Sequence, residues 1–165
     1  MKNNSKIMIG LIAAVFVIGA FSMKSWNSGG ADGKEYQGTV AGDSVEVVLY
    51  KSPTCSCCEN YVKYLKKQGF SVETIAKTDM NSVKQEYGIP RNMESCHTMA
   101  INGYVVEGHV PVDAINKLLT EKPAIQGIAL PGMPAGSPGM PGIKSGRFTI
   151  NALTSGGYSS VFMEL

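Results

Sequence analysis

All four cysteines of this 165-residue chain lie in two short motifs, and these motifs constrain its fold more than any other feature. The first motif, Ser-Pro-Thr-Cys-Ser-Cys-Cys at residues 52–58, directly follows a β-branched run at 45–50 that predicts a buried strand. Residues 59–68 have the apolar spacing of a helix, so three cysteines belong to a strand-to-helix turn. The second motif, Ser-Cys-His-Thr at 95–98, precedes another apolar run. We expect the two motifs to meet in space.

The remaining elements predict an α/β domain with the order β-α-β-α-β-β-α. We expect a strand at 70–75, a helix at 79–87 capped by Asp79, a hairpin of residues 98–101 and 104–107 around Asn102-Gly103, and a helix from Pro111 to Pro123. This is the order of the thioredoxin/glutaredoxin fold, with the cysteine turn between its first strand and first helix.

The C-terminal part differs in composition. Residues 127–142 hold five glycines and four prolines, which predicts neither a helix nor a central strand. Residues 148–163 alternate around a glycine turn, so we expect a terminal β-hairpin that extends or covers the sheet.

The N-terminus has the features of an export segment. Residues 1–6 carry two lysines, and residues 7–21 are an unbroken run of apolar residues and glycine, shorter than the about 20 residues of a membrane-spanning helix. We expect residues 1–23 to be a signal peptide or an N-terminal membrane anchor, 24–44 a flexible linker, and 45–165 the folded domain. Either outcome places the domain in the periplasm or another extracytoplasmic space, free or anchored to the inner membrane, with membrane contact only through that segment.

Charge argues against a nucleic-acid partner. Three of the 15 basic residues lie in the first 24 positions, which contain no acid, so residues 25–165 hold 12 basic and 13 acidic side chains. A chain without a basic patch has no electrostatic basis for binding nucleic acid.

The cysteine turn suits either a soft metal ion or thiol–disulfide exchange, because a helix N-terminus favours the thiolate that both need. Three features favour the metal. Cys57 adds a third thiol to the Cys55–Cys58 pair, where an exchange enzyme needs two. The place before the third strand, where thioredoxin-type oxidoreductases usually carry a cis-proline, holds Cys96. Several methionines add thioether donors, which suit Cu(I) and suit Zn(II) poorly.

Other donors are secondary candidates. We favour His109 over His97 as a nitrogen ligand, although a lone histidine before a helix is as often a structural residue. Met99, Met133 and Met140 are candidate thioether ligands, and the last two could equally fill space under a loop.

Three alternatives to copper binding stay open. The first is a thiol–disulfide oxidoreductase with Cys55 as nucleophile and Cys58 as resolving thiol. The second is a scaffold with structural disulfides, the usual state of cysteines in an exported chain. The third is a zinc-stabilised interaction module.

The motifs together resemble the CopG family of exported, thioredoxin-like proteins associated with copper resistance. The resemblance rests on residues 55–58, 95–98, 103–111 and the Pro/Gly/Met stretch at 131–140, and it covers the chain from 45 to about 165. It implies that Cys55, Cys57, Cys58 and Cys96 hold Cu(I), singly or in a small multinuclear cluster. It also implies a role in copper export or in interconverting Cu(I) and Cu(II).

The sequence therefore predicts an exported copper-binding protein for resistance, delivery or interconversion of the two copper oxidation states. Copper ions are its expected partners, together with copper efflux or chaperone proteins. Whether the protein is also a copper oxidoreductase stays open, and binding is the favoured activity.

Overall fold

The computed structural model describes residues 44–156 and 159–165, so the expected export segment and nearly all of the expected linker lie outside the described residues. Within them, the strands are β1 (Glu46–Lys51), β2 (Ser71–Ala76), β3 (His97–Ile101), β4 (Tyr104–Glu107), β5 (Gly127–Ala129), β6 (Thr149–Leu153) and β7 (Ser159–Glu164). The helices are α1 (Ser56–Lys67), α2 (Met80–Glu86), a 3-10 turn η1 (Arg91–Met93) and α3 (Val112–Glu121). None of these helices combines the length and the apolar character needed to cross a membrane.

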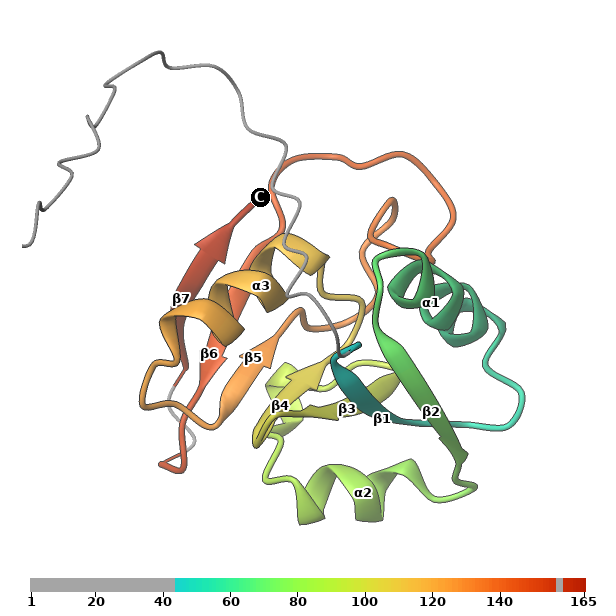
Figure 1. Ribbon diagram of the computed structural model, residues 1–165, viewed down its shortest axis with the longest axis horizontal. Coiled ribbons are helices and arrows are strands. Elements are labelled where there is room, and N and C mark those ends of the chain that lie inside the picture. Colours follow the sequence, from blue (N-terminus) through green and yellow to red (C-terminus); the bar gives the residue numbers. More distant parts are fainter. Residues whose placement is uncertain (1–43, 157–158) are drawn as a thin grey trace, which may run out of the picture. The chain divides into compact units, whose positions relative to one another are not determined.

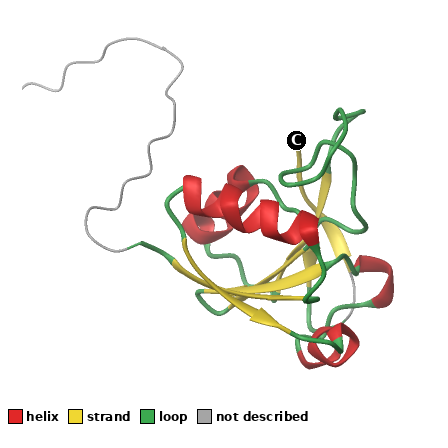
Figure 2. Cartoon of the chain, turned by 90° about the vertical axis from the view of Figure 1, so that its right-hand side faces the viewer, coloured by secondary structure: helices red, strands yellow, loops and turns green. Residues whose placement is uncertain are grey.

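One mixed sheet organises the described residues, in the order β2-β1-β3-β4-β5-β6-β7 (Figure 1). β1 with β2 and β4 with β5 are parallel pairs, and the other neighbours are antiparallel. Helices α1 and α3 cover one face, and α2 with η1 lies on the other (Figure 2). The larger core, which includes Leu65 of α1 and Leu118 of α3, fills the first face. A smaller core around Ile89, Met93 and Val105 fills the second.

Local sequence signals account for most element boundaries. Asp79 Oδ1 accepts hydrogen bonds from the backbone N–H groups of Asn81 and Ser82, as expected for the cap of α2. Asn102 and Gly103 both have positive φ in the β3–β4 turn, as the hairpin signal requires. The predicted terminal hairpin is present as β6 and β7, and it extends the sheet.

Helix α1 begins three residues earlier than residues 59–68 indicated. Its N-cap is Cys55, whose Sγ accepts a hydrogen bond from the N–H of Cys58 at 3.3 Å. Sulfur is not one of the usual capping atoms, so the apolar pattern alone did not reveal this start. Cys57 and Cys58 therefore lie in the first turn of the helix.

The expectation that residues 127–142 contain no central strand is wrong at its beginning. Gly127–Ala129 forms β5, which pairs with β4 on one side and β6 on the other. The prolines begin only at Pro131, so these three residues keep the N–H groups that a ladder needs. Gly127 fits because the chains approach closely: a Cβ atom there would lie 1.8 Å from the carbonyl oxygen of Val105.

We predict that Gly127→Ala strongly destabilises the fold, because its methyl group would overlap the β4 backbone, which cannot move aside as a flexible side chain can. Overpacking of this kind costs about 1–3 kcal/mol or more. Chemical denaturation of the variant measures this loss. The matched control is Gly156→Ala, since an added Cβ at Gly156 meets no atom of the described residues within 4 Å. Equal stabilities for the two variants would contradict the close approach at β5.

Candidate metal centre

The pairing of β1 with β3 brings the two cysteine motifs together. These strands are antiparallel, with Lys51 opposite His97, so β1 ends where β3 begins. The cysteine turn follows Lys51, and Cys96 directly precedes His97. Both motifs consequently lie at the same end of the strand pair.

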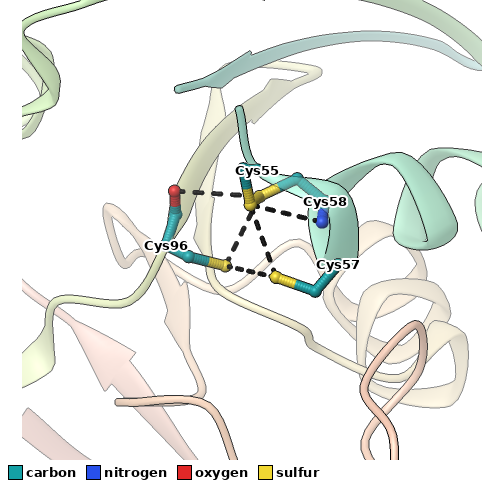
Figure 3. A group of neighbouring side chains, drawn as sticks. All are labelled: Cys55, Cys57, Cys58 and Cys96. Carbon is teal, nitrogen blue, oxygen red and sulfur yellow. Dashed lines mark hydrogen bonds between the residues drawn. A yellow bond between two sulfur atoms is a disulfide. The ribbon is translucent and has the colours of Figure 1, made fainter. Parts of the chain in front are cut away.

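The four sulfur atoms form one group at this end (Figure 3). Cys96 Sγ lies 3.5 Å from Cys58 Sγ and 3.9 Å from Cys57 Sγ. Cys57 Sγ lies 3.4 Å from Cys55 Sγ. All four Sγ atoms are within 4.8 Å of one another, so the predicted convergence of the motifs is confirmed. Cys58 is fully buried, and the other three are partly exposed.

Two of these sulfurs are joined. Cys55 and Cys58 form a disulfide, while Cys57 and Cys96 are free. The disulfide leaves two thiols beside it, each in contact with one of its sulfurs. Two electrons and two protons would convert the group into four thiols. The arrangement thus combines a redox-active pair with a set of four potential soft ligands.

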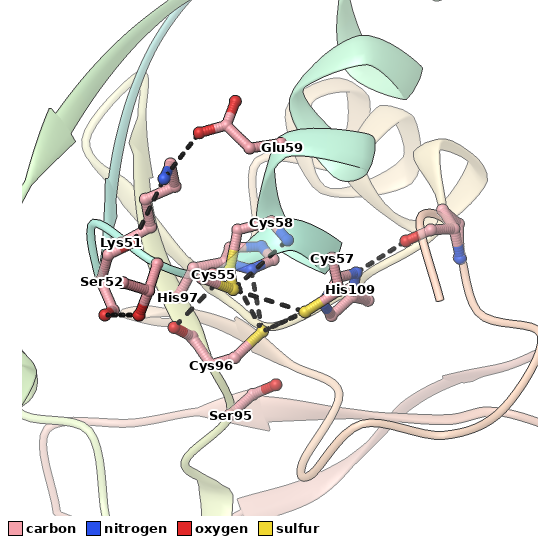
Figure 4. Close-up of a disulfide and its surroundings, with 12 residues drawn as sticks. Lys51, Ser52, Cys55, Cys57, Cys58, Glu59, Ser95, Cys96, His97 and His109 are labelled. Carbon is pink, nitrogen blue, oxygen red and sulfur yellow. Dashed lines mark hydrogen bonds and ion pairs between the residues drawn. A yellow bond between two sulfur atoms is a disulfide. The ribbon is translucent and has the colours of Figure 1, made fainter. Parts of the chain in front are cut away.

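His109 adds a nitrogen donor to the group (Figure 4). Its Nε2 atom lies 3.0 Å from Cys96 Sγ, and its Nδ1 lies 2.7 Å from the carbonyl oxygen of Pro138. A carbonyl oxygen only accepts, so Nδ1 carries the proton and the Nε2 lone pair faces the sulfur. Burial lowers the pKa of His109, which keeps the ring neutral. A neutral imidazole held in this way is the form that binds metals.

His97, which the sequence analysis placed second to His109 as a nitrogen donor, also lies at Cys96. Its Nδ1 lies 3.4 Å from Cys96 Sγ, and its ring packs against the rings of Tyr61 and His109. Cys96, His97 and His109 form a second group of donor atoms within 4.8 Å. His97 is fully buried, and its Nε2 is without a hydrogen-bond partner in the part of the chain that the structure describes. Its position next to Cys96 was the available signal.

The Cys96 thiol is protonated in this form of the protein. Burial, and then the neighbouring Cys57, raises its pKa to about 12. Such a thiol is a poor nucleophile in exchange reactions. A bound metal ion would displace the proton, because a coordinating thiol is deprotonated.

The Pro/Gly/Met loop, defined as residues 131–147, lies against the first two turns of α1. A Cβ atom on Gly139 would lie 2.7 Å from Tyr61 N and 3.0 Å from Cys57 O. Next to this contact, the carbonyl oxygen of Pro138 accepts the hydrogen bond from His109 Nδ1. Met140 is half-buried in the loop and Met133 is exposed. Met99 is fully buried in the larger core, and the role of the three methionines as ligands stays a prediction.

Known proteins resemble this chain over most of its length. The family model described as "Protein of unknown function, DUF411" matches residues 93–140. Two solved structures, named "Copper resistance protein copG- Form 2" and "Copper resistance protein copG- Form 1", are each 39% identical and cover 74% of this chain. The match spans 99% and 98% of those chains, with TM-scores of 0.69 and 0.68. No curated protein matches the chain.

We predict that Gly139→Ala releases His109 from its single tautomer. The added methyl group would push the loop off α1 and move the Pro138 carbonyl away from Nδ1. Nitrogen-15 NMR of the metal-free protein should show the Nδ1–H form in the wild type and a mixture of tautomers in the variant. Gly132→Ala is the matched control: both glycines have positive φ, but within the part of the chain that the structure describes an added Cβ at Gly132 meets nothing within 4 Å. A mixture in both variants would show that the loop contact does not hold the ring.

We also predict that the metal-free protein loses stability as the pH falls below about 6.5. Burial holds the pKa of His97 well below its usual 6.5, so the unfolded chain binds a proton that the folded chain does not. This contribution is complete above pH 6.5 and falls by up to about 1.4 kcal/mol per pH unit below it. Denaturation of the wild type and of His97→Phe between pH 7.5 and 5 measures the difference. Parallel stability curves would refute a neutral, buried His97.

Proposed function

Because the chain belongs to the CopG family of copper-resistance proteins, we propose that it binds Cu(I) through its cysteine cluster. The single observation that carries the proposal is the position of Cys96, whose sulfur lies 3.5 Å from Cys58 Sγ across a separation of 38 residues. Two motifs that are distant in sequence thereby bring four sulfur atoms together. Soft thiolates stabilise Cu(I), and thiolates can bridge two ions, so the group suits one ion or a small cluster.

The proposed ligands divide into two sets. Cys55, Cys57, Cys58 and Cys96 are the sulfur ligands, and loading requires prior reduction of the Cys55–Cys58 disulfide. His109 offers a nitrogen donor to the same group, since its lone pair faces Cys96. Three of the four cysteines are partly exposed, which permits ions to be taken up and released by ligand exchange. Met133 and Met140 are proposed as additional thioether ligands at the loop.

The cellular setting follows from the same proposal. The strand and helix order from β1 to α3 supports a thioredoxin-like domain, extended by β5 and the β6–β7 hairpin. We place this domain outside the cytoplasm, with the N-terminal residues as its signal or anchor. There it would sequester copper, pass it to efflux or chaperone proteins, or interconvert Cu(I) and Cu(II).

One observation favours a second function. The Cys55–Cys58 disulfide at a helix N-terminus is the arrangement of a thiol–disulfide oxidoreductase. Reduction of this disulfide is required for copper loading and is also a step of thiol–disulfide exchange, so the disulfide alone does not distinguish the two functions. Cys57 distinguishes the two functions, because thiol–disulfide exchange needs only the Cys55–Cys58 pair.

We predict that Cys57→Ser weakens Cu(I) binding by more than the about 10- to 100-fold that loss of a supporting outer residue usually costs. Anaerobic titration of the reduced protein against a competing Cu(I) chelator, with metal counting, measures the affinity and the stoichiometry. Ser56→Ala is the control, because Ser56 is exposed in the same helical turn.

The alternatives give different results in this experiment. An oxidoreductase would keep its rate of exchange with a small disulfide in Cys57→Ser, and copper binding by the wild type would be weak. A zinc module would bind Zn(II) tetrahedrally and resist displacement by Cu(I). Either result would reject the copper proposal.

A further inference from the structure

A fully buried carboxylate lies next to the metal centre and provides none of its proposed ligands. Glu107, the last residue of β4, is 0% exposed. Its Oε1 accepts a hydrogen bond from the backbone N–H of Ser95 at 2.6 Å, and its Oε2 accepts one from Thr98 Oγ1 at 2.6 Å. Lys84 of α2, also buried, forms an ion pair with Oε1. Glu107 therefore contacts three segments: α2, β3 and the turn that carries Cys96.

Glu107, Lys84 and Thr98, which we call the Glu107 network, lie on the face of the sheet opposite to the sulfur group. Successive strand residues point to opposite faces, so Thr98 faces away from His97 and the sulfur group. Glu107 is paired with Thr98 across the β3–β4 ladder and lies on the same face. From there the carboxylate reaches past the start of β3 to the backbone of Ser95.

Lys84 balances the negative charge of the buried Glu107 carboxylate. Burial raises the pKa of Glu107, and the nearby ammonium of Lys84 opposes that shift. A buried ion pair rarely adds net stability compared with apolar residues of the same size. Apolar side chains could therefore replace the pair if its role were only to fill the core. They could not accept the hydrogen bond from the Ser95 N–H.

Ser95 is also held on its other sides. Its hydroxyl donates to the carbonyl oxygen of Gly132, and the N–H of Gly132 donates to the carbonyl oxygen of Glu94 at 3.0 Å. Gly108 leaves room for this contact, since a Cβ there would lie 2.7 Å from Ser95 Oγ. These contacts surround a turn whose peptide bonds are all trans.

We propose that Glu107, neutralised by Lys84, is a positioning residue that fixes the Ser95-Cys96 backbone and so directs Cys96 Sγ into the cysteine cluster. The metal-binding consequence rests on the proposed function, but the position of Cys96 does not. The carboxylate acts through one hydrogen bond, to Ser95 N, and its effect is passed to the next residue in the chain.

Two double variants test the proposal. Lys84→Met with Glu107→Gln removes both charges but keeps an amide oxygen that can accept from Ser95 N and an amide N–H that can donate to Thr98 Oγ1. Lys84→Met with Glu107→Leu removes the same charges and provides no acceptor. The two proteins thus have the same charge and differ in the side chain that faces Ser95 N and Thr98 Oγ1. Thermal unfolding of both shows whether they remain folded.

We call the Lys84→Met/Glu107→Gln protein the glutamine pair and the Lys84→Met/Glu107→Leu protein the leucine pair. The glutamine pair should behave as wild type. The leucine pair should bind Cu(I) about 10- to 100-fold more weakly, and X-ray absorption should show one sulfur fewer per site around copper. Without metal, in the protein with its disulfide intact, mass spectrometry should show Cys96 alkylated several-fold faster in the leucine pair only. Equal affinity, coordination and alkylation in the two pairs would overturn the proposal.

The alkylation result is independent of copper. Absence of Cu(I) binding by the wild type would reject the proposed function, while a difference in Cys96 alkylation would still support positioning by Glu107. If the leucine pair fails to fold, NMR of the wild type decides. The Ser95 amide proton should then be strongly downfield and slow to exchange, and exchange as fast as that of an exposed amide would overturn the proposal.

Discussion

The antiparallel pairing of β1 with β3 is the interaction on which the proposed site depends. It sets Lys51 opposite His97, and this register places the cysteine turn and Cys96 within sulfur contact distance. A shift by one residue would reverse the faces of the β3 side chains and turn His97 away from the cluster. The register is secured by the core side chains on the same strands, including Leu49 and Met99, which are fully buried.

Burial keeps the side chains of His109 and Cys96 uncharged before any cation binds. His109 is neutral with its lone pair aimed at Cys96, and the Cys96 thiol keeps its proton. A site of this kind carries little charge of its own, so a soft metal ion would gain strong ligands as it displaces protons. The Pro/Gly/Met loop supports this state from outside, and the Glu107 network supports it from the opposite face of the sheet.

Much of the fold could be predicted from short-range signals. The Asp79 cap, the Asn102-Gly103 turn and the apolar spacing of α3 are local features, and each gave its element within a few residues. The cysteine cluster was predictable as well, because the strand-to-helix turn and the later strand implied neighbouring ends. β5 was missed since its place in the sheet depends on the close approach of Gly127 to Val105, which lies 22 residues earlier.

The sequence by itself determined which chemistry is available: four thiols in two motifs, with histidine beside them, on an alternating helix-and-strand pattern. Tertiary structure decided how those groups are used. It brought both His97 and His109 to Cys96 and placed the Lys84–Glu107 pair behind Ser95. Spacing along the chain sets only local geometry. Side-chain direction, burial and protonation depend on partners from distant segments, which are specified only when the sheet and its helices pack together.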